Sequence, residues 1–198
     1  SIDFTIDWGD GGSDTVTAYD DDLGEGAIDH VYSSADTYTI KLAGTIRGFK
    51  FDNGGDRTKI KTITQWGTFD ISVNDAFKGS SALDVTATDA PTISSTDLAH
   101  TFNGCTTLTS IGGDWDTSSV TTTQQMFLGC TNFNQDISAW NTASVTSMQA
   151  MFYQAAAFNQ AINTSGSSWD VSSVTNMGAM FGYATAFNGN ITSWIPSD

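Results

Sequence analysis

A repeat of about 25 residues constrains this chain more than any other feature of its sequence. Phenylalanines recur at steps of 25, 25, 25 and 29 residues, at Phe77, Phe102, Phe127, Phe152 and Phe181. In each copy a second large apolar residue follows six positions later, at Leu83, Leu108, Phe133, Phe158 and Phe187. Self-similarity at a fixed period of this length is typical of a solenoid, in which each coil packs on its neighbours.

The copy from Val145 to Trp169 predicts how one coil is built. Its apolar spacing fits one face of a short helix over residues 145–152, with Ser144 as the N-cap. Residues 158–162 predict a short extended segment. The methionines of this face are Met148 and Met151, with Met177 and Met180 in the next copy. We expect an α/β solenoid with one continuous core, because no coil can cover its own apolar face.

Two further columns recur once per copy. The tryptophans are Trp115, Trp140, Trp169 and Trp194, and the asparagines are Asn134, Asn159 and Asn188. Exposed, the tryptophans would form a stripe for stacking on sugar rings; buried, they would close the edge of each coil, which is the simpler interpretation. We expect the asparagines to form a hydrogen-bonded ladder that satisfies backbone groups in a tight turn.

Cys105 and Cys130 occupy the same place in consecutive copies. If adjacent coils are spaced like strands of a sheet, about 4.8 Å apart, the pair falls within reach of a disulfide. Two buried thiols are the alternative, and we favour it because the coils can spread at this turn. A column of threonines at Thr121, Thr146 and Thr175 could form a flat hydroxyl face suited to ice, although helix capping explains these residues more simply.

The first 46 residues follow a different period. Ile2, Phe4 and Ile6 alternate with polar residues, which predicts a strand. Further strands are expected at 15–19, 28–32 and 37–43, giving a small antiparallel β unit. We expect residues 47–58 to form a linker or hairpin, and residues 59–198 to form a solenoid of about five coils.

Charge excludes several classes of partner. The net charge is −15, and every Lys and Arg lies between Lys41 and Lys78. A negative surface repels the phosphates of nucleic acids and of anionic lipids. No apolar run reaches the ~20 residues that a membrane span needs. The chain begins at Ser1 rather than Met, so we expect it to be a processed or excised piece.

Acidic residues crowd two N-terminal loops: Asp7, Asp10, Asp14, Asp20, Asp21, Asp22 and Glu25. Converging carboxylates are what Ca²⁺ requires. Their spacing differs from the D-x-D-x-D-G loop, since Gly12 stands at the place of the middle ligand. Solvated turn residues are the simpler interpretation, and calcium is the one cofactor that the sequence suggests.

The chain carries no recognisable catalytic motif. His30 and His100 are far apart in sequence, and neither a zinc-protease motif nor a nucleophile elbow is present. We therefore expect a protein that is not an enzyme.

The repeat V-T-x-M-x-x-M-F-x-x-x-x-x-F-N-x-x-I-x-x-W resembles the BspA-type leucine-rich repeats of the DUF285 family, over residues 59–194. That resemblance implies secreted or cell-surface proteins that adhere to a host or matrix. The turn Trp8-Gly9-Asp10-Gly11 followed by His30-Val31-Tyr32 resembles the PKD family of immunoglobulin-like sandwiches, over about 45 residues. We interpret this piece as a half-sandwich that caps the first coil.

Two functions remain open at this stage. The first is extracellular recognition or adhesion, with a protein or glycan on a host, a matrix or a neighbouring cell bound by the solenoid face. The second is a structural subunit of a surface layer, filament or virion appendage. Only four residues follow Trp194, so an open apolar coil end could join identical subunits head to tail.

Overall fold

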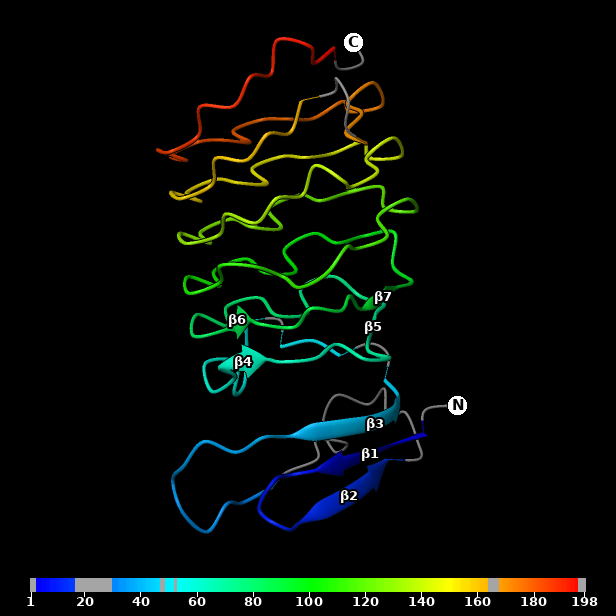
Figure 1. The fold of residues 1–198 in the computed structure, drawn as a ribbon, viewed down its shortest axis with the longest axis vertical. Coiled ribbons are helices and arrows are strands. Elements are labelled where there is room, and N and C mark those ends of the chain that lie inside the picture. The colour runs from blue at the N-terminus through cyan, green and yellow to red at the C-terminus, as the bar shows by residue number, and fades with distance from the viewer. Residues whose placement is uncertain (1–2, 17–29, 47–48, 52, 164–167, 196–198) are drawn as a thin grey trace. The chain divides into compact units, whose positions relative to one another are not determined.

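The computed structural model describes residues 3–16, 30–46, 49–51, 53–163 and 168–195 (Figure 1). The chain divides into two compact units, Ser1–Arg47 and Gly48–Asp198. Each unit is built on its own pattern of backbone pairing.

The first unit is a three-stranded antiparallel sheet. Its strands are β1 (Asp3–Asp7), β2 (Ser13–Val16) and β3 (Lys41–Thr45), in the order β2-β1-β3. Ile6 lies opposite Leu42 and is buried, as is Ile46 just after β3. The alternation of apolar and polar residues in β1 places Phe4 and Ile6 on one face, as period-two patterns do, but Leu42 on the neighbouring strand is 45% exposed, so the face is only partly covered.

Three of the expected strands differ in this unit. The strand expected at 15–19 begins earlier, at Ser13, and residues 17–19 lie outside the described residues. Residues 30–32 and 37–40 are not strands, and the last strand begins at Lys41. The physical reason is aromatic packing: His30 stacks on Trp8 at 4.7 Å, and Tyr32 stacks on Tyr38 at 4.0 Å.

The second unit is a stack of coils, where one coil is one copy of the repeat (Figure 1). Near its start, β4 (Thr62–Ile63) pairs in parallel with β6 (Asp84–Val85), and β5 (Asp70–Ile71) with β7 (Thr92–Ile93). Later coils are joined by single parallel bridges that link Asp97 to Thr122, Thr122 to Ser147 and Ser147 to Asn176. Residues that lie one repeat apart in the sequence are therefore neighbours in space.

A ladder of backbone hydrogen bonds runs along one edge of the stack, and its amides donate to the following coil; elsewhere amides donate to the preceding coil, as Thr146 does to Thr121 at 2.8 Å. In one coil, the amides of alternate residues donate to carbonyls of the next coil: Thr123 to Ser147, Gln125 to Gln149, Phe127 to Met151 and Gly129 to Tyr153, at 2.8–3.0 Å. The residues between them donate within their own coil, three residues back, as Met126 does to Thr123. Each coil therefore needs the following coil to satisfy half of these amides.

Two columns of rings fill the core. Phe77, Phe102, Phe127, Phe152 and Phe181 stack face to face with centroids 5.5–5.9 Å apart. Phe133, Phe158 and Phe187 form a second column at 6.0 Å, and Leu83 and Leu108 are fully buried at the same place in earlier coils. A stacked aromatic pair contributes ~0.5–1.5 kcal/mol beyond the burial of its area. The phenylalanine period therefore fixes the axis of the stack.

The short helix expected at 145–152 is wrong, and no helix occurs among the described residues. A helix would use each amide for the carbonyl four residues back, whereas Met148 and Ala150 donate to the next coil instead. Ala150 also has a φ of 52°, in the left-handed region that a right-handed helix excludes. Ser144 is consequently no N-cap, and its hydroxyl donates to the carbonyl of Ser118.

Two other boundaries differ from expectation. Residues 49–51 and 53–58 belong with the coils and are not a linker, since the amides of Phe51 and Asn53 donate to Ala76 and Lys78 at 2.8 and 3.2 Å. The extended segment expected at 158–162 forms no strand. Its pairing is carried by side chains, as described below.

Candidate functional site

In the last coil of the stack, residues 174–194, several apolar side chains are more exposed than their equivalents in the preceding coil. Met148 and Phe152 are fully buried, whereas their equivalents Met177 and Phe181 are only partly buried. Ile162 is 1% exposed, and its equivalent Ile191 is 39% exposed. The residue types are the same, so the difference comes from the absence of a following coil among the described residues.

The backbone of the last coil is uncovered as well. Four alternate amides occupy the donor positions of the ladder: Met177, Ala179, Phe181 and Tyr183. None of the four has an acceptor within the described part of the chain. The amides between them, such as Met180 and Gly182, donate to Met177 and Ala179 as in earlier coils. The end of the stack thus presents a row of donors that all point one way.

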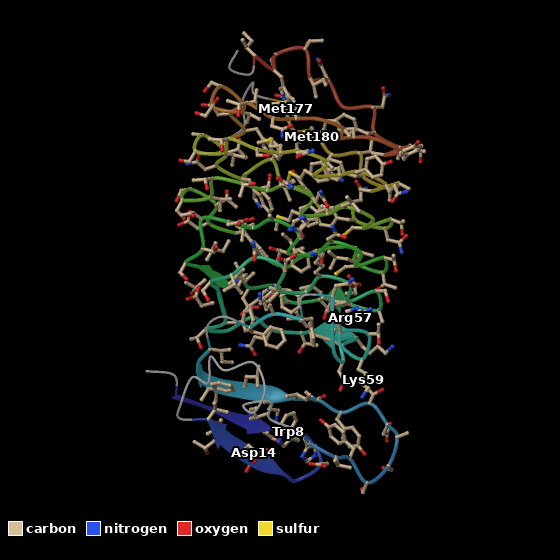
Figure 2. The ribbon with its side chains drawn as sticks, turned by 180° about the vertical axis from the view of Figure 1, so that it is seen from behind. Trp8, Asp14, Arg57, Lys59, Met177 and Met180 are labelled. Atoms are coloured by element: carbon tan, nitrogen blue, oxygen red, sulfur yellow. The ribbon has the colours of Figure 1, made fainter. Side chains whose placement is uncertain are left out.

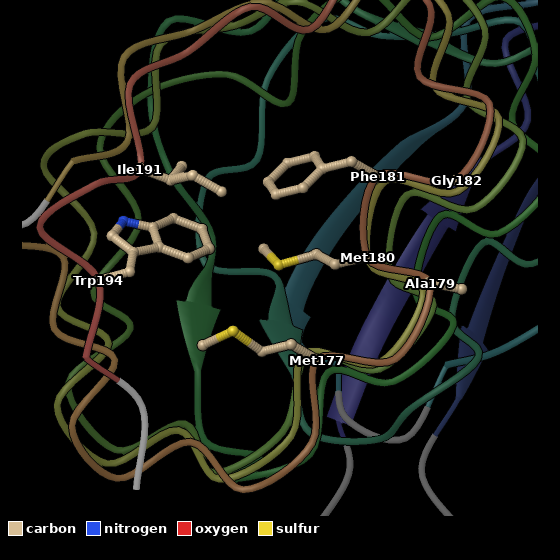
Figure 3. A pocket seen from close by; sticks show the side chains of 7 residues that line it. All are labelled: Met177, Ala179, Met180, Phe181, Gly182, Ile191 and Trp194. Carbon is tan, nitrogen blue, oxygen red and sulfur yellow. The ribbon is translucent and has the colours of Figure 1, made fainter.

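An apolar cavity of about 250 Å³ lies beside this row. It is lined by Met177, Ala179, Met180, Phe181, Gly182, Ile191 and Trp194. Figure 3 shows the side chains of Met180, Phe181, Ile191 and Trp194 pointing toward one another across it, while that of Ala179 points away. Figure 2 places Met177 and Met180 at the C-terminal end of the unit. We call this cavity and the four amides the end surface.

The tryptophan column lies inside the coils. Trp115, Trp140 and Trp169 are at most 4% exposed, and Trp194, in the last coil, is partly buried. The indole nitrogens of Trp169 and Trp194 donate to the carbonyls of Ile137 and Ile162, at 2.8 and 2.9 Å. Three of these rings therefore offer no face to a sugar, and only Trp194 lines an open surface.

The asparagines form a side-chain ladder. Asn134 accepts the amide of Asn159 through its Oδ1 at 2.9 Å, and Asn159 accepts the amide of Asn188 at 2.7 Å. Asp84 accepts the amide of Thr109 in the same way in an earlier coil, at 2.8 Å. These side-chain oxygens, two from carboxamides and one from a carboxylate, join neighbouring coils by accepting backbone amides.

The threonine column is exposed, with every hydroxyl already donating. Thr121, Thr146 and Thr175 each donate to the carbonyl of the column residue one coil earlier, at 3.0–3.2 Å. Their role is to join coils, and the explanation by helix capping is wrong because no helix forms among the described residues.

The two cysteines are free thiols, both fully buried, and do not form the disulfide that the sequence left open. Each donates to a carbonyl of the preceding coil, Cys105 to Phe77 at 3.2 Å and Cys130 to Phe102 at 3.0 Å. Burial raises the pKa of Cys105 to about 12 and that of Cys130 well above its usual value. Protonated thiols of this kind are poor nucleophiles.

The described carboxylates of the expected calcium loop are each held by a local partner. Asp14 accepts from the indole of Trp8 at 2.6 Å, a pair labelled in Figure 2. Asp10 accepts the amide of Gly12 and contacts the imidazole of His30 at 2.7 Å, and both contacts lower the pKa of Asp10. Asp7 accepts the amide of Gly9.

No group of three metal-binding side chains occurs among the described residues. The remaining members of the loop, Asp20, Asp21, Asp22 and Glu25, lie outside them. Calcium binding at this loop stays a prediction.

A polar cluster near the start of the stack was not anticipated from the sequence. Lys78 pairs with Asp75 at 2.8 Å, and His100 Nδ1 lies 3.4 Å from the same carboxylate. Asp75 and His100 both have a φ of 58° and hold equivalent places in consecutive coils. The only sequence signal for the contact is their spacing of 25 residues, one repeat.

The family model described as "Mycoplasma protein of unknown function, DUF285" matches residues 51–163 and, in a second overlapping match, residues 96–198. No curated protein and no solved structure matches the chain. Within the described ranges, no helix is long and apolar enough to cross a bilayer.

Proposed function

Since this chain belongs to the DUF285 family, we propose that it is a non-catalytic recognition or adhesion protein of the cell exterior. The proposed partner is a protein or glycan on a host, a matrix or a neighbouring cell. In this proposal, residues 49–195 are a solenoid of BspA-type leucine-rich repeats, and residues 1–46 are a PKD-like module.

The parallel ladder and the aromatic columns support the solenoid, since both repeat once per coil. The stacked Trp8 and His30 with the Tyr32 hydroxyl on the carbonyl of Trp8 support the PKD-like module, because they use the residues of its motif. The excess of carboxylates over cations supports a soluble exterior location, where a net charge far from zero opposes aggregation.

The observation that carries the proposal is the end surface. In a soluble protein, a contiguous apolar surface with a row of unpaired amides is a surface that a partner or a further coil covers. Ile191 is 39% exposed at the rim of the cavity, beside the partly buried Trp194. An aromatic ring in an apolar recess with convergent donors is a typical anchor point of an interface.

The test is a binding screen of the chain against a printed glycan array and a panel of purified matrix proteins. Ile191→Asp places a charge in the cavity, and we expect it to abolish the binding that the wild type shows. Ile195→Asp is the matched control, because Ile195 is 79% exposed and does not line the cavity. Binding that Ile191→Asp leaves intact, or no binding in the screen, would contradict the proposal.

The second candidate is a structural subunit that assembles through its ends. The polarity of the ladder favours it, because the ladder amides of one coil donate to carbonyls of the following coil and stacks of this kind can add to one another head to tail. Sedimentation velocity over a concentration series separates the two. Growth into long species supports assembly, and a monomer at every concentration excludes it as the main role.

A further inference from the structure

Two tyrosines from neighbouring coils meet on the side of the stack. The ring centroids of Tyr153 and Tyr183 lie 5.2 Å apart, with the rings edge to face at 81°. They are the only tyrosines in residues 48–198. The proposed function does not use this pair.

A glycine makes the contact possible. Counted from Phe152 and Phe181, the place of Tyr153 is taken in the next coil by Gly182. A Cβ on Gly182 would lie 2.5 Å from Cδ2 of Tyr153, so any larger residue there would displace the ring. The ring of Tyr153 therefore lies over Gly182, beside Tyr183, which is the following residue.

The pair faces the side of the stack and not its end. Gln154 holds the place of Tyr183 one coil earlier, and it is exposed although its amide donates to the carbonyl of Gly182 in the following coil at 2.7 Å. A following coil therefore leaves this column open at the side. Tyr183 is 70% exposed and Tyr153 is half-buried, so a dissolved oxidant can reach the pair.

We propose that Tyr153 and Tyr183 form an oxidative cross-linking site, at which hydrogen peroxide and a peroxidase join the two rings as dityrosine. This inference goes beyond the proposed function and needs no binding partner. The product is a covalent bond between two coils that are otherwise held together by packing and hydrogen bonds.

The atoms and electrons of this step balance. Each phenol gives up one electron and its hydroxyl proton, and the two radicals form a carbon–carbon bond between ring positions ortho to the oxygens. The hydrogens of those two carbons move to the oxygens, which restores both phenols. The O–O bond of the peroxide breaks, and the two electrons and two protons convert it to two water molecules.

The test treats the whole chain with a peroxidase and limiting hydrogen peroxide. We expect a monomer that has lost the mass of two hydrogens and has gained the fluorescence of dityrosine, at a rate that does not change on dilution. Peptide mapping should place the link between Tyr153 and Tyr183. Because a cross-link restricts the unfolded chain, the product should also melt at a higher temperature than the untreated chain.

Three variants sharpen the test. Tyr183→Phe keeps a ring at this place but has no phenol to oxidise, so it should abolish the product. Gly182→Ala displaces the ring of Tyr153 and should slow the coupling. Tyr38→Phe is the matched control, because Tyr38 stacks on Tyr32 at 4.0 Å in the first unit, and it should leave the link in the second unit unchanged.

Several results would overturn the inference: links between chains only, a link that maps only to Tyr32 and Tyr38, or a product that persists in Tyr183→Phe. Circular dichroism melting before oxidation checks that each variant is folded. The outcome is independent of the binding screen, since a mapped link with no bound partner contradicts the proposed function alone, and binding without a link contradicts this inference alone.

Discussion

The coil at residues 145–169 and the coil at residues 174–194 have nearly the same residues at equivalent places, yet they differ in what they bury. Phe152 is stacked on both sides, by Phe127 and Phe181, whereas Phe181 has a coil on one side only. Ile162 and Ile191 differ in the same way, at 1% and 39% exposed.

This difference shows that burial and hydrogen bonding in the stack are properties of pairs of coils. The residues of one copy supply an apolar face and a row of donors, and the next copy covers them. Stability in such an array is approximately a sum over coils and their interfaces. Among the described residues the last coil has one interface, and its second face is chemically equal to the faces that bind a coil elsewhere in the chain.

The largest expected contrast is between the two central phenylalanines. Phe152→Ala opens a cavity between two coils, and we expect it to lower the free energy of unfolding by ~3–5 kcal/mol. Phe181→Ala should cost roughly half as much, because a partly buried ring loses less area from burial. Urea unfolding followed by tryptophan fluorescence measures both, and equal costs would contradict the comparison.

A thiol placed in each coil tests the same contrast by reactivity. Ala155 and Ala184 are the counterparts of the cysteines, at 0% and 8% exposed. In a background with both native cysteines replaced by alanine, Ala184→Cys should react with a thiol reagent at pH 8 about tenfold faster than Ala155→Cys. The reason is that full burial raises the pKa of a thiol at this column, to about 12 at Cys105, and only the thiolate reacts. Equal rates in the folded state would show that the last coil is as well covered as its neighbour.

The smallest contrast concerns the asparagine ladder. Asn159 Oδ1 accepts the amide of Asn188, whereas Asn188 Oδ1 accepts no amide among the described residues. Asn159→Ala should therefore lower the free energy of unfolding by ~1 kcal/mol, and Asn188→Ala by less than about 0.5 kcal/mol. Chemical unfolding of the two variants checks this, and a larger cost at Asn188 would indicate that its side chain has a partner.

The sequence predicted the parts of this fold that depend on side-chain period. The spacing of Phe77 to Phe181 predicted the column of phenylalanine rings, and the spacing of Asn134 to Asn188 predicted the ladder of asparagine side chains. The prediction of the backbone within a coil was wrong, because residues 145–152 have the apolar spacing of a helix but do not form one. Whether an amide bonds within its own segment or to the next coil is decided by the neighbouring coil, which a local pattern does not contain.

The end surface was only half predictable. An open apolar end followed from the repeat, but the row of donors did not, because backbone amides have no signature in the residue types. The strands expected at 28–32 and 37–43 failed for a similar reason: His30 stacks on Trp8, and Tyr32 contacts His30 and stacks on Tyr38, rather than continuing the alternation.

Amide hydrogen exchange measured by NMR tests the central claim most directly. The two rows to compare are Met148, Ala150, Phe152 and Gln154 in the covered coil, and Met177, Ala179, Phe181 and Tyr183 in the last coil. Amides with an acceptor between coils exchange only through opening of the stack, so the first row should exchange at least about a hundredfold more slowly than the second. Equal protection of the two rows would contradict the account, because it would mean that the last coil is already covered.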